Sequence, residues 1–267
     1  MKKFPVIALR NVSGALALLF MTSVLAFAQG TASSKATAAI NTAVGCTLAA
    51  TSTMGDIVPQ TCHDIFSGAA VTVTPDNFAS IMKSTIKVSN SQSLVVSPSL
   101  VTGLYTQTKT KTSTGTTSTA TAEGGVYLRA IVTNQATGAV QIGYPVAVCN
   151  PDILGCYADS NGNYGVTLDS RVQTLTQSIS DCIVNVGDVT GTCTFDLTTD
   201  LILKTTSAHT YNFIFPSVGV GVYTVEIQAG VNANAFVGGT ATAVGAAAYG
   251  LGSLTVESVR LVHDFSF

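Results

Sequence analysis

Residues 101–132 read VTGLYTQTKTKTSTGTTSTATAEGGVYLRAIV, and the predicted fold follows from how this stretch is interpreted. Apolar and polar residues alternate at both of its ends, a pattern typical of half-buried strands. The middle, residues 106–122, is mainly threonine and serine around Gly115. Such a run serves as a flexible linker in some proteins, but threonine also favours strands. We favour two long strands, 101–112 and 116–132, that pair with each other in a hairpin at Gly115.

The same alternation continues along the rest of the chain, between glycine, asparagine and proline residues that mark turns. The pattern predicts strands near 71–74, 85–88, 94–97, 103–112, 125–133, 145–149, 164–168, 172–179, 192–197, 209–215, 222–229 and 253–262. Short strands at regular spacing are typical of sandwiches rather than of parallel α/β sheets. We therefore expect an all-β protein, an antiparallel β-sandwich of the immunoglobulin-like or jelly-roll type.

The composition excludes several classes of protein. Of the 267 residues, 46% are hydrophobic and 10% are charged, which excludes an intrinsically disordered chain and a coiled coil. Twelve basic residues without clusters argue against a nucleic-acid partner.

The N-terminus has the features of a secretory signal peptide, predicted here as residues 1–28. Lys2, Lys3 and Arg10 precede an apolar run, which ends in the small-x-small sequence Ala26-Phe27-Ala28. The run is too short to span a membrane comfortably, so we expect no membrane span after cleavage.

The predicted mature chain has a mild negative charge. Removing 28 of the 267 residues leaves 239, with nine basic against 14 acidic residues, a net charge of −5. We expect residues 29–75 to form an N-terminal arm with a disulfide-pinned loop, and residues 76–267 to form the sandwich. Within the arm, residues 32–50 fit either a frayed helix or an extended segment, and residues 75–82 fit a short helix.

All six cysteines lie in the mature chain, and an even number after a signal peptide is typical of disulfides. Six cysteines allow 15 pairings. We favour the three that are local in sequence, which would staple the fold with up to three disulfides: Cys46–Cys62, Cys149–Cys156 and Cys182–Cys193. The sequence has no Cys-x-x-Cys and no close pair of histidines, so we expect neither a metal site nor a cofactor.

One local motif has a functional and a structural interpretation. Asp159, Asn161 and Asn163 stand at alternate positions, as calcium ligands do in a loop. However, Tyr164 stands where an EF-hand loop needs glycine, and no glutamate stands at the twelfth position. An Asn-Gly turn explains the same residues, and we favour it over calcium.

Two resemblances to known proteins accompany these patterns. The segments Ala136-Thr137-Gly138, Tyr144-Pro145-Val146 and Asp159-Ser160-Asn161-Gly162-Asn163-Tyr164 resemble a pattern of carboxypeptidase-regulatory-like, transthyretin-like modules. That resemblance implies a passive structural or binding unit, although the Cys149–Cys156 loop is an insertion. Residues 93–262 are also similar to segments of uncharacterised exported prokaryotic β-sandwich proteins, which implies fold and export only.

The C-terminal tail alternates Leu261, His263, Phe265 and Phe267. It fits an ordinary last strand, or a strand that contacts a neighbouring subunit.

Candidate catalytic residues are few. We read His63, His209 and His263 as ordinary surface or edge residues, and no G-x-S-x-G motif is present. The remaining catalytic alternative is a hydrolase, but the sequence identifies no residue as its nucleophile.

These features predict a non-catalytic exported structural protein of the cell surface or extracellular space, with the periplasm as the alternative location. In one variant it self-associates into filaments through the arm at 29–50 or the tail at 261–267. The alternative is an adhesion module that recognises glycan or another surface protein through the loops closed by Cys149–Cys156 and Cys182–Cys193.

Overall fold

The computed structural model describes residues 35–68, 74–180, 182–186 and 189–260, and of residues 182–186 and 189–193 it describes the backbone alone. The predicted signal peptide and C-terminal tail lie outside these ranges. The elements in chain order are β1 (Ala36–Asn41), β2 (Gly45–Ser52), α2 (Cys62–Ile65), β3 (Ala79–Val88), β4 (Gln92–Ser113), β5 (Thr117–Asn134), β6 (Val140–Ile142), the 3-10 helix η2 (Val146–Val148), β7 (Cys156–Ala158), β8 (Tyr164–Ser178), β9 (Cys182–Val186), β10 (Val189–Cys193), β11 (Asp196–Thr210), β12 (Phe213–Val218), β13 (Gly221–Gly238) and β14 (Thr240–Val259).

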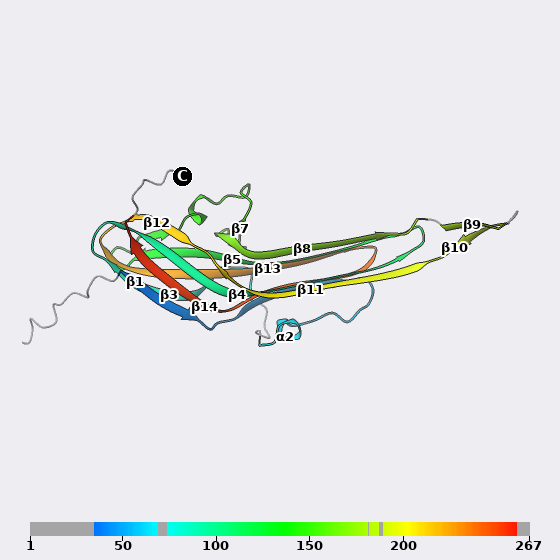
Figure 1. The fold of residues 1–267 in the computed structure, drawn as a ribbon, viewed down its shortest axis with the longest axis horizontal. Coiled ribbons are helices and arrows are strands. Elements are labelled where there is room, and N and C mark those ends of the chain that lie inside the picture. The colour runs from blue at the N-terminus through cyan, green and yellow to red at the C-terminus, as the bar shows by residue number, and fades with distance from the viewer. Residues whose placement is uncertain (1–34, 69–73, 181, 187–188, 261–267) are drawn as a thin grey trace, which may run out of the picture. The chain divides into compact units, whose positions relative to one another are not determined.

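Two antiparallel sheets pack face to face, so the predicted all-β sandwich is confirmed (Figure 1). Sheet A has the order β1–β14–β4–β11, with β2 also paired to β14 and β12 to β4. Sheet B has the order β3–β13–β5–β8–β7, with β6 paired to β5. Strands β9 and β10 form a ribbon of their own between β8 and β11.

The long threonine-rich stretch turns where the sequence predicts, but its strands do not pair with each other. Gly115 has φ of +77°, and the backbone N–H of Thr116 donates to the carbonyl of Ser113 at 3.0 Å. However, β4 pairs in sheet A and β5 pairs in sheet B. The predicted hairpin is therefore wrong, and the connection is a β-arch that crosses from one sheet to the other.

Two other connections at the same end of the sandwich also cross between the sheets. Strand β13 continues into β14 through Gly239, and β8 reaches β11 through the β9–β10 ribbon. The strand orders β14–β4–β11 and β13–β5–β8 match, so the three arches lie side by side. Each strand thus finds its hydrogen-bonding partner in the neighbouring arch rather than in its own.

Away from the arches, large side chains fill the interior. We call this part of the sandwich the apolar half. Its fully buried members include Ile86, Leu94, Val96, Leu100, Leu128, Phe213, Phe215, Val225, Ile227, Leu254 and Val256. They come from both sheets and alternate along each strand, as the period of two requires.

Near the arches, small side chains replace the large ones. We call this part the arcade half. Its interior includes Thr106, Thr108, Thr110 and Thr112 of β4, Ser118, Ala120 and Ala122 of β5, Gln173 and Gln177 of β8, and Ala241, Ala243 and Gly245 of β14. A Cβ atom on Gly245 would overlap the carbonyl oxygen of Glu123, and one on Gly124 would lie 2.7 Å from that of Ala246. The two sheets therefore approach here to backbone contact.

Polar residues inside the arcade half bond to one another across the two sheets. The hydroxyl of Thr106 donates to Oε1 of Gln173 at 2.6 Å, and Nε2 of Gln173 donates to the hydroxyl of Thr108 at 2.7 Å. The hydroxyl of Thr110 donates to Oε1 of Gln177 at 2.8 Å. Buried polar groups are tolerated when they are paired in this way.

Two strands of the predicted N-terminal arm belong to sheet A. Strand β1 pairs with the second half of β14, and β2 pairs with its first half. Their alanine and threonine side chains suit an extended strand beside the alanine-rich β14, so β1 and β2 belong to the sandwich rather than to a separate arm. The short helix expected at 75–82 is also absent, because β3 begins at Ala79.

Candidate functional site

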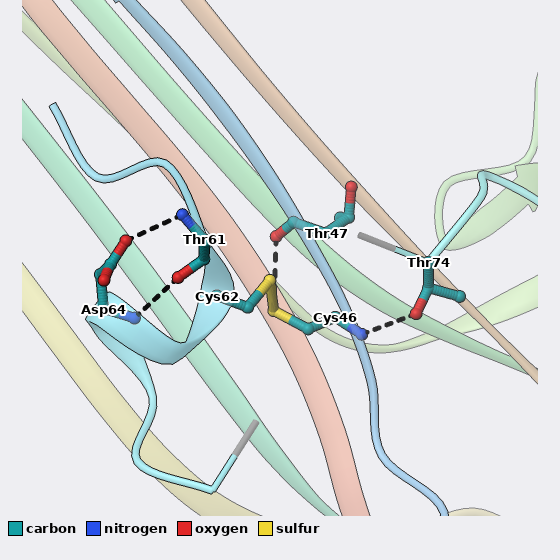
Figure 2. Close-up of a disulfide and its surroundings, with 6 residues drawn as sticks. All are labelled: Cys46, Thr47, Thr61, Cys62, Asp64 and Thr74. Carbon is teal, nitrogen blue, oxygen red and sulfur yellow. Dashed lines mark hydrogen bonds between the residues drawn. A yellow bond between two sulfur atoms is a disulfide. The ribbon is translucent and has the colours of Figure 1, made fainter. Parts of the chain in front are cut away.

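Two of the predicted disulfides, Cys46–Cys62 and Cys149–Cys156, are present and confirm the local pairing. Figure 2 shows the first, which joins β2 to the start of α2. At the start of α2, Thr61 and Asp64 form a reciprocal capping box, and hydrogen bonds from the backbone and hydroxyl of Thr61 lower the pKa of Asp64.

Disulfides persist in oxidising compartments, so the two disulfides indicate a location outside the cytoplasm. Among the described helices, none is long and apolar enough to cross a membrane.

The third predicted pair, Cys182 and Cys193, lies where only the backbone is described. The register of the β9–β10 ribbon places these two residues directly opposite each other. The Cys182–Cys193 disulfide stays a prediction.

The first disulfide holds a segment over the outer face of sheet A. Ile65 and Phe66 pack there with Val244, Ala246 and the disulfide itself. A cavity of about 350 Å³ lies beside Phe66. Its one charged lining residue is Lys204, whose Nζ lies 5.7 Å from the centre of the Phe66 ring and donates to the carbonyl of Ile65.

The predicted calcium residues form a turn that is closed by its own carboxylate. Oδ1 of Asp159 accepts from the backbone N–H groups of Asn161 and Asn163, at 2.9 and 2.8 Å. Oδ2 accepts from the backbone N–H of Phe78 at 3.0 Å and from the Asn163 amide at 3.3 Å. Gly162 has φ of +77°, as such a turn needs.

These hydrogen bonds determine the direction in which the pKa of Asp159 shifts. Burial acts to raise its pKa, but the bonds from Phe78, Asn163 and Asn161 outweigh it and lower the pKa. N–H donors thus occupy both oxygens that a calcium ion would need, and the geometry favours the turn.

The structure brings His209 into a polar cluster with a serine and an aspartate. Oγ of Ser207 lies 2.7 Å from Nε2 of His209, and Oδ2 of Asp169 lies 3.4 Å from the same nitrogen. The hydroxyl of Thr102 donates to that carboxylate oxygen at 2.6 Å. In a catalytic triad the serine and the carboxylate bind opposite nitrogens of the imidazole. Here they share one nitrogen, so the cluster joins β4, β8 and β11 and lacks the triad arrangement.

The structure describes one of the other two histidines. His63 is exposed on α2, and His263 lies outside the described residues.

An aromatic cluster that no sequence pattern indicates lies on the outer face of sheet B. The rings of Tyr127 and Tyr157 stack with centroids 3.7 Å apart and planes at 9°. Tyr157 follows the Cys149–Cys156 disulfide, and its hydroxyl donates to Asp76. Asn232 and Asn234 lie along the same face, where the amide of Asn234 donates to Glu123 at 3.1 Å.

The sequence also does not show which sheet edge stays open. In the described chain, β11 pairs with β4 alone, and β8 beyond Thr167 pairs with β5 alone. The predicted subunit-contact residues Leu261, His263, Phe265 and Phe267 lie outside the described residues. The described chain therefore has an open edge along β8 and β11, in addition to the edges formed by β1, β2 and β3.

No protein-family model matches the sequence, and no curated protein matches it. Solved structures give remote likenesses. Chains of the infectious bursal disease virus Gx strain and of the T13 IBDV particle are each 10% identical, with TM-scores of 0.12 and 0.13 over 96% of this chain. The V. cholerae type IV competence pilus secretin PilQ is 7% identical over 94% of this chain and 83% of its own, with a TM-score of 0.10.

The chain spans 44% of each of the two viral chains. Likenesses this remote carry no argument about fold or function. The resemblance to transthyretin-like modules stays a prediction.

Proposed function

We propose that this chain is a non-catalytic structural protein that is exported to the cell surface or the extracellular space. The arcade half carries the proposal. Three arches share two continuous sheets, and their interior is filled by small residues and by paired polar groups. Such an interior leaves each strand little freedom to move, because the backbones themselves are in contact.

The two disulfides support the same structural role. Cys46–Cys62 lies on the outer face of sheet A, and Cys149–Cys156 closes the loop before β8. Each closes a short segment and restricts the unfolded chain, by about 2–3 kcal/mol in the chain-entropy model. A protein that works outside the cell benefits from this stability, because chaperones of the cytoplasm do not reach it.

Localisation tests the export part of the proposal. An antibody against the mature chain is applied to intact, fractionated and lysed cells, and the thiol content of the recovered protein is measured. We expect surface or extracellular protein without reactive thiols. Reduced protein in the cytoplasmic fraction would overturn the proposal.

Covalent probes test the non-catalytic part. A fluorophosphonate probe is incubated with the purified mature chain, followed by peptide mass spectrometry. We expect no adduct at Ser207, because His209 also faces Asp169 through the nitrogen that would take the serine proton. An adduct at Ser207 that disappears in His209→Gln would instead identify a hydrolase.

A second candidate function is glycan binding on the outer face of sheet B. The observation that favours it is the Tyr127–Tyr157 stack beside Asp76, Glu123 and Asn232, since aromatic edges with carboxylates and amides are suited to hydroxyl-rich ligands. A glycan array with the wild type and Tyr157→Ala tests it. Binding that Tyr157→Ala abolishes and Tyr164→Ala retains would support this function, and an array without binding would exclude it.

A further inference from the structure

We propose that two copies of this chain join edge to edge, with β11 antiparallel to β11 of the second copy and β8 antiparallel to β8. Sheet A and sheet B would each continue into the corresponding sheet of the second copy. This inference rests on the proposed structural role. It adds that the partner is a second copy of the chain and that the contact surface is the edge of β8 and β11.

The first observation is that both sheets end at the same level on this side. Nη2 of Arg171 in β8 donates to the hydroxyl of Thr205 in β11 at 2.9 Å. The amide of Gln173 donates to the carbonyl of Leu201, also at 2.9 Å. A single added strand would cover one of these edges, whereas a second copy would cover both.

The second observation is that apolar side chains of β11 point inward and are still exposed. Leu197, Leu201 and Leu203 pair with threonines of β4 that are fully buried between the sheets. Residues directly opposite in an antiparallel pair lie on the same face, so these leucines also face the interior. They are 51%, 43% and 44% exposed because the sandwich ends at β11. A second copy at this edge would bury them.

The third observation is that little protects β8 against pairing beyond its bulge at Thr167–Asp169, where Arg171 is the one charged residue. Neither β8 nor β11 contains proline, and the solvent-facing residues of β8 from Ser170 to Ser178 are uncharged. Natural edge strands avoid pairing through lysine, proline or bulges. Strand β3, at the opposite edge of sheet B, carries Lys83 and Lys87 on its outer face.

The charges of β11 match a second copy of the same strand. A two-fold axis normal to the sheets pairs an edge antiparallel with itself, and an interface of this type must be self-complementary. With Ile202 on the axis, Asp200 of each copy lies opposite Lys204 of the other. All three side chains lie on the outer face of sheet A, and Ile202 is 53% exposed.

Light scattering after size exclusion, on the mature chain from Gln29, tests the inference. We expect twice the chain mass for the wild type and a monomer for Ile202→Lys, because two lysines would meet on the axis. Ile40→Lys, at the exposed residue of β1 on the other edge, is the matched control and should stay dimeric. A wild-type monomer, or a dimer that Ile202→Lys leaves intact, would overturn the inference.

A charge exchange tests the register. Asp200→Lys and Lys204→Asp should each weaken the dimer at least tenfold, and the double variant should recover most of that loss. Double-variant binding no better than that of either single variant would contradict this register. A folded wild-type monomer would contradict the edge pairing alone. The proposed structural role would still be tested by the localisation and probe experiments.

Discussion

The apolar half and the arcade half are built from the same long strands, among them β4 and β14, yet they are held together differently. In β4, the residues up to Leu100 that face inward are leucine, valine and proline, and those beyond Leu104 are threonine. In β14 the order is reversed, with alanine and glycine first and leucine and valine last. One half excludes water with large side chains, whereas the other brings the two backbones together.

A continuous strand therefore does not imply the same kind of core along its whole length. Large side chains keep packed sheets roughly 10 Å apart. Glycine and alanine allow closer approach, and the remaining inward polar groups then need partners across the sheets. The arcade half meets this need with Gln173 and Gln177, which bond to the threonines of β4.

The largest expected effect comes from truncating an aromatic residue in the apolar half. Phe213 is fully buried between the sheets, so Phe213→Ala should lower the free energy of unfolding by about 3–5 kcal/mol. Chemical denaturation with far-UV circular dichroism measures this. Phe236→Ala is the control, because Phe236 in β13 of the arcade half is 57% exposed and should change stability by about 0.5 kcal/mol or less. Equal losses in both variants would contradict the comparison.

The next effect comes from adding one carbon atom inside the arcade half. A Cβ at residue 245 would overlap the carbonyl oxygen of Glu123, so Gly245→Ala should cost about 1–3 kcal/mol by forcing the sheets apart. Gly238→Ala is the matched control, because a Cβ there meets nothing within 4 Å. Thermal unfolding of the two variants measures the difference. Unchanged stability in Gly245→Ala would show that the sheets are not in backbone contact.

Removing a polar partner inside the arcade half should have a similar or smaller effect. Gln173→Ala leaves the hydroxyls of Thr106 and Thr108 buried without their partner, at a cost of about 1–3 kcal/mol. Replacing all three residues, with valine for the threonines and leucine for Gln173, should recover much of this loss, because no polar group is then left unpaired. Urea denaturation compares the two. A triple variant less stable than Gln173→Ala would argue that the hydrogen bonds themselves hold this half together.

Much of the fold was predictable because its signals are local. The turn at Gly115, the two confirmed disulfides and the turn at Asp159 each depend on residues close in sequence. The pairing of β4 with β14 and β11 was not predictable, because a hairpin and an arch share the same strands and the same turn. Only contacts between distant segments distinguish the two.

Some strands and the aromatic cluster were not predictable for the same reason, because they depend on contacts between distant segments. Residues 232–249 are rich in alanine, glycine and asparagine, which strand propensity disfavours. Small residues suit these strands because the backbones of β5 and β14 approach each other closely at Gly245. Tyr127 and Tyr157 lie 30 positions apart, and no pattern in the sequence indicates that their rings stack.

The smallest expected effect concerns the outer face of sheet B, at the boundary of the two halves. Burial, and then the charges of Asp76 and Glu123, raise the pKa of Tyr127 from 10.0 to about 12. A raised pKa means that the folded state holds the proton more tightly, so the stabilisation is complete below pH 10 and is lost as the pH rises toward 12. At pH 11 the loss from Tyr127 is up to about 1.4 kcal/mol. Tyr127→Phe should therefore lose less stability than the wild type between pH 9 and pH 11, and equal losses would show that Tyr127 titrates normally and is not covered at this boundary.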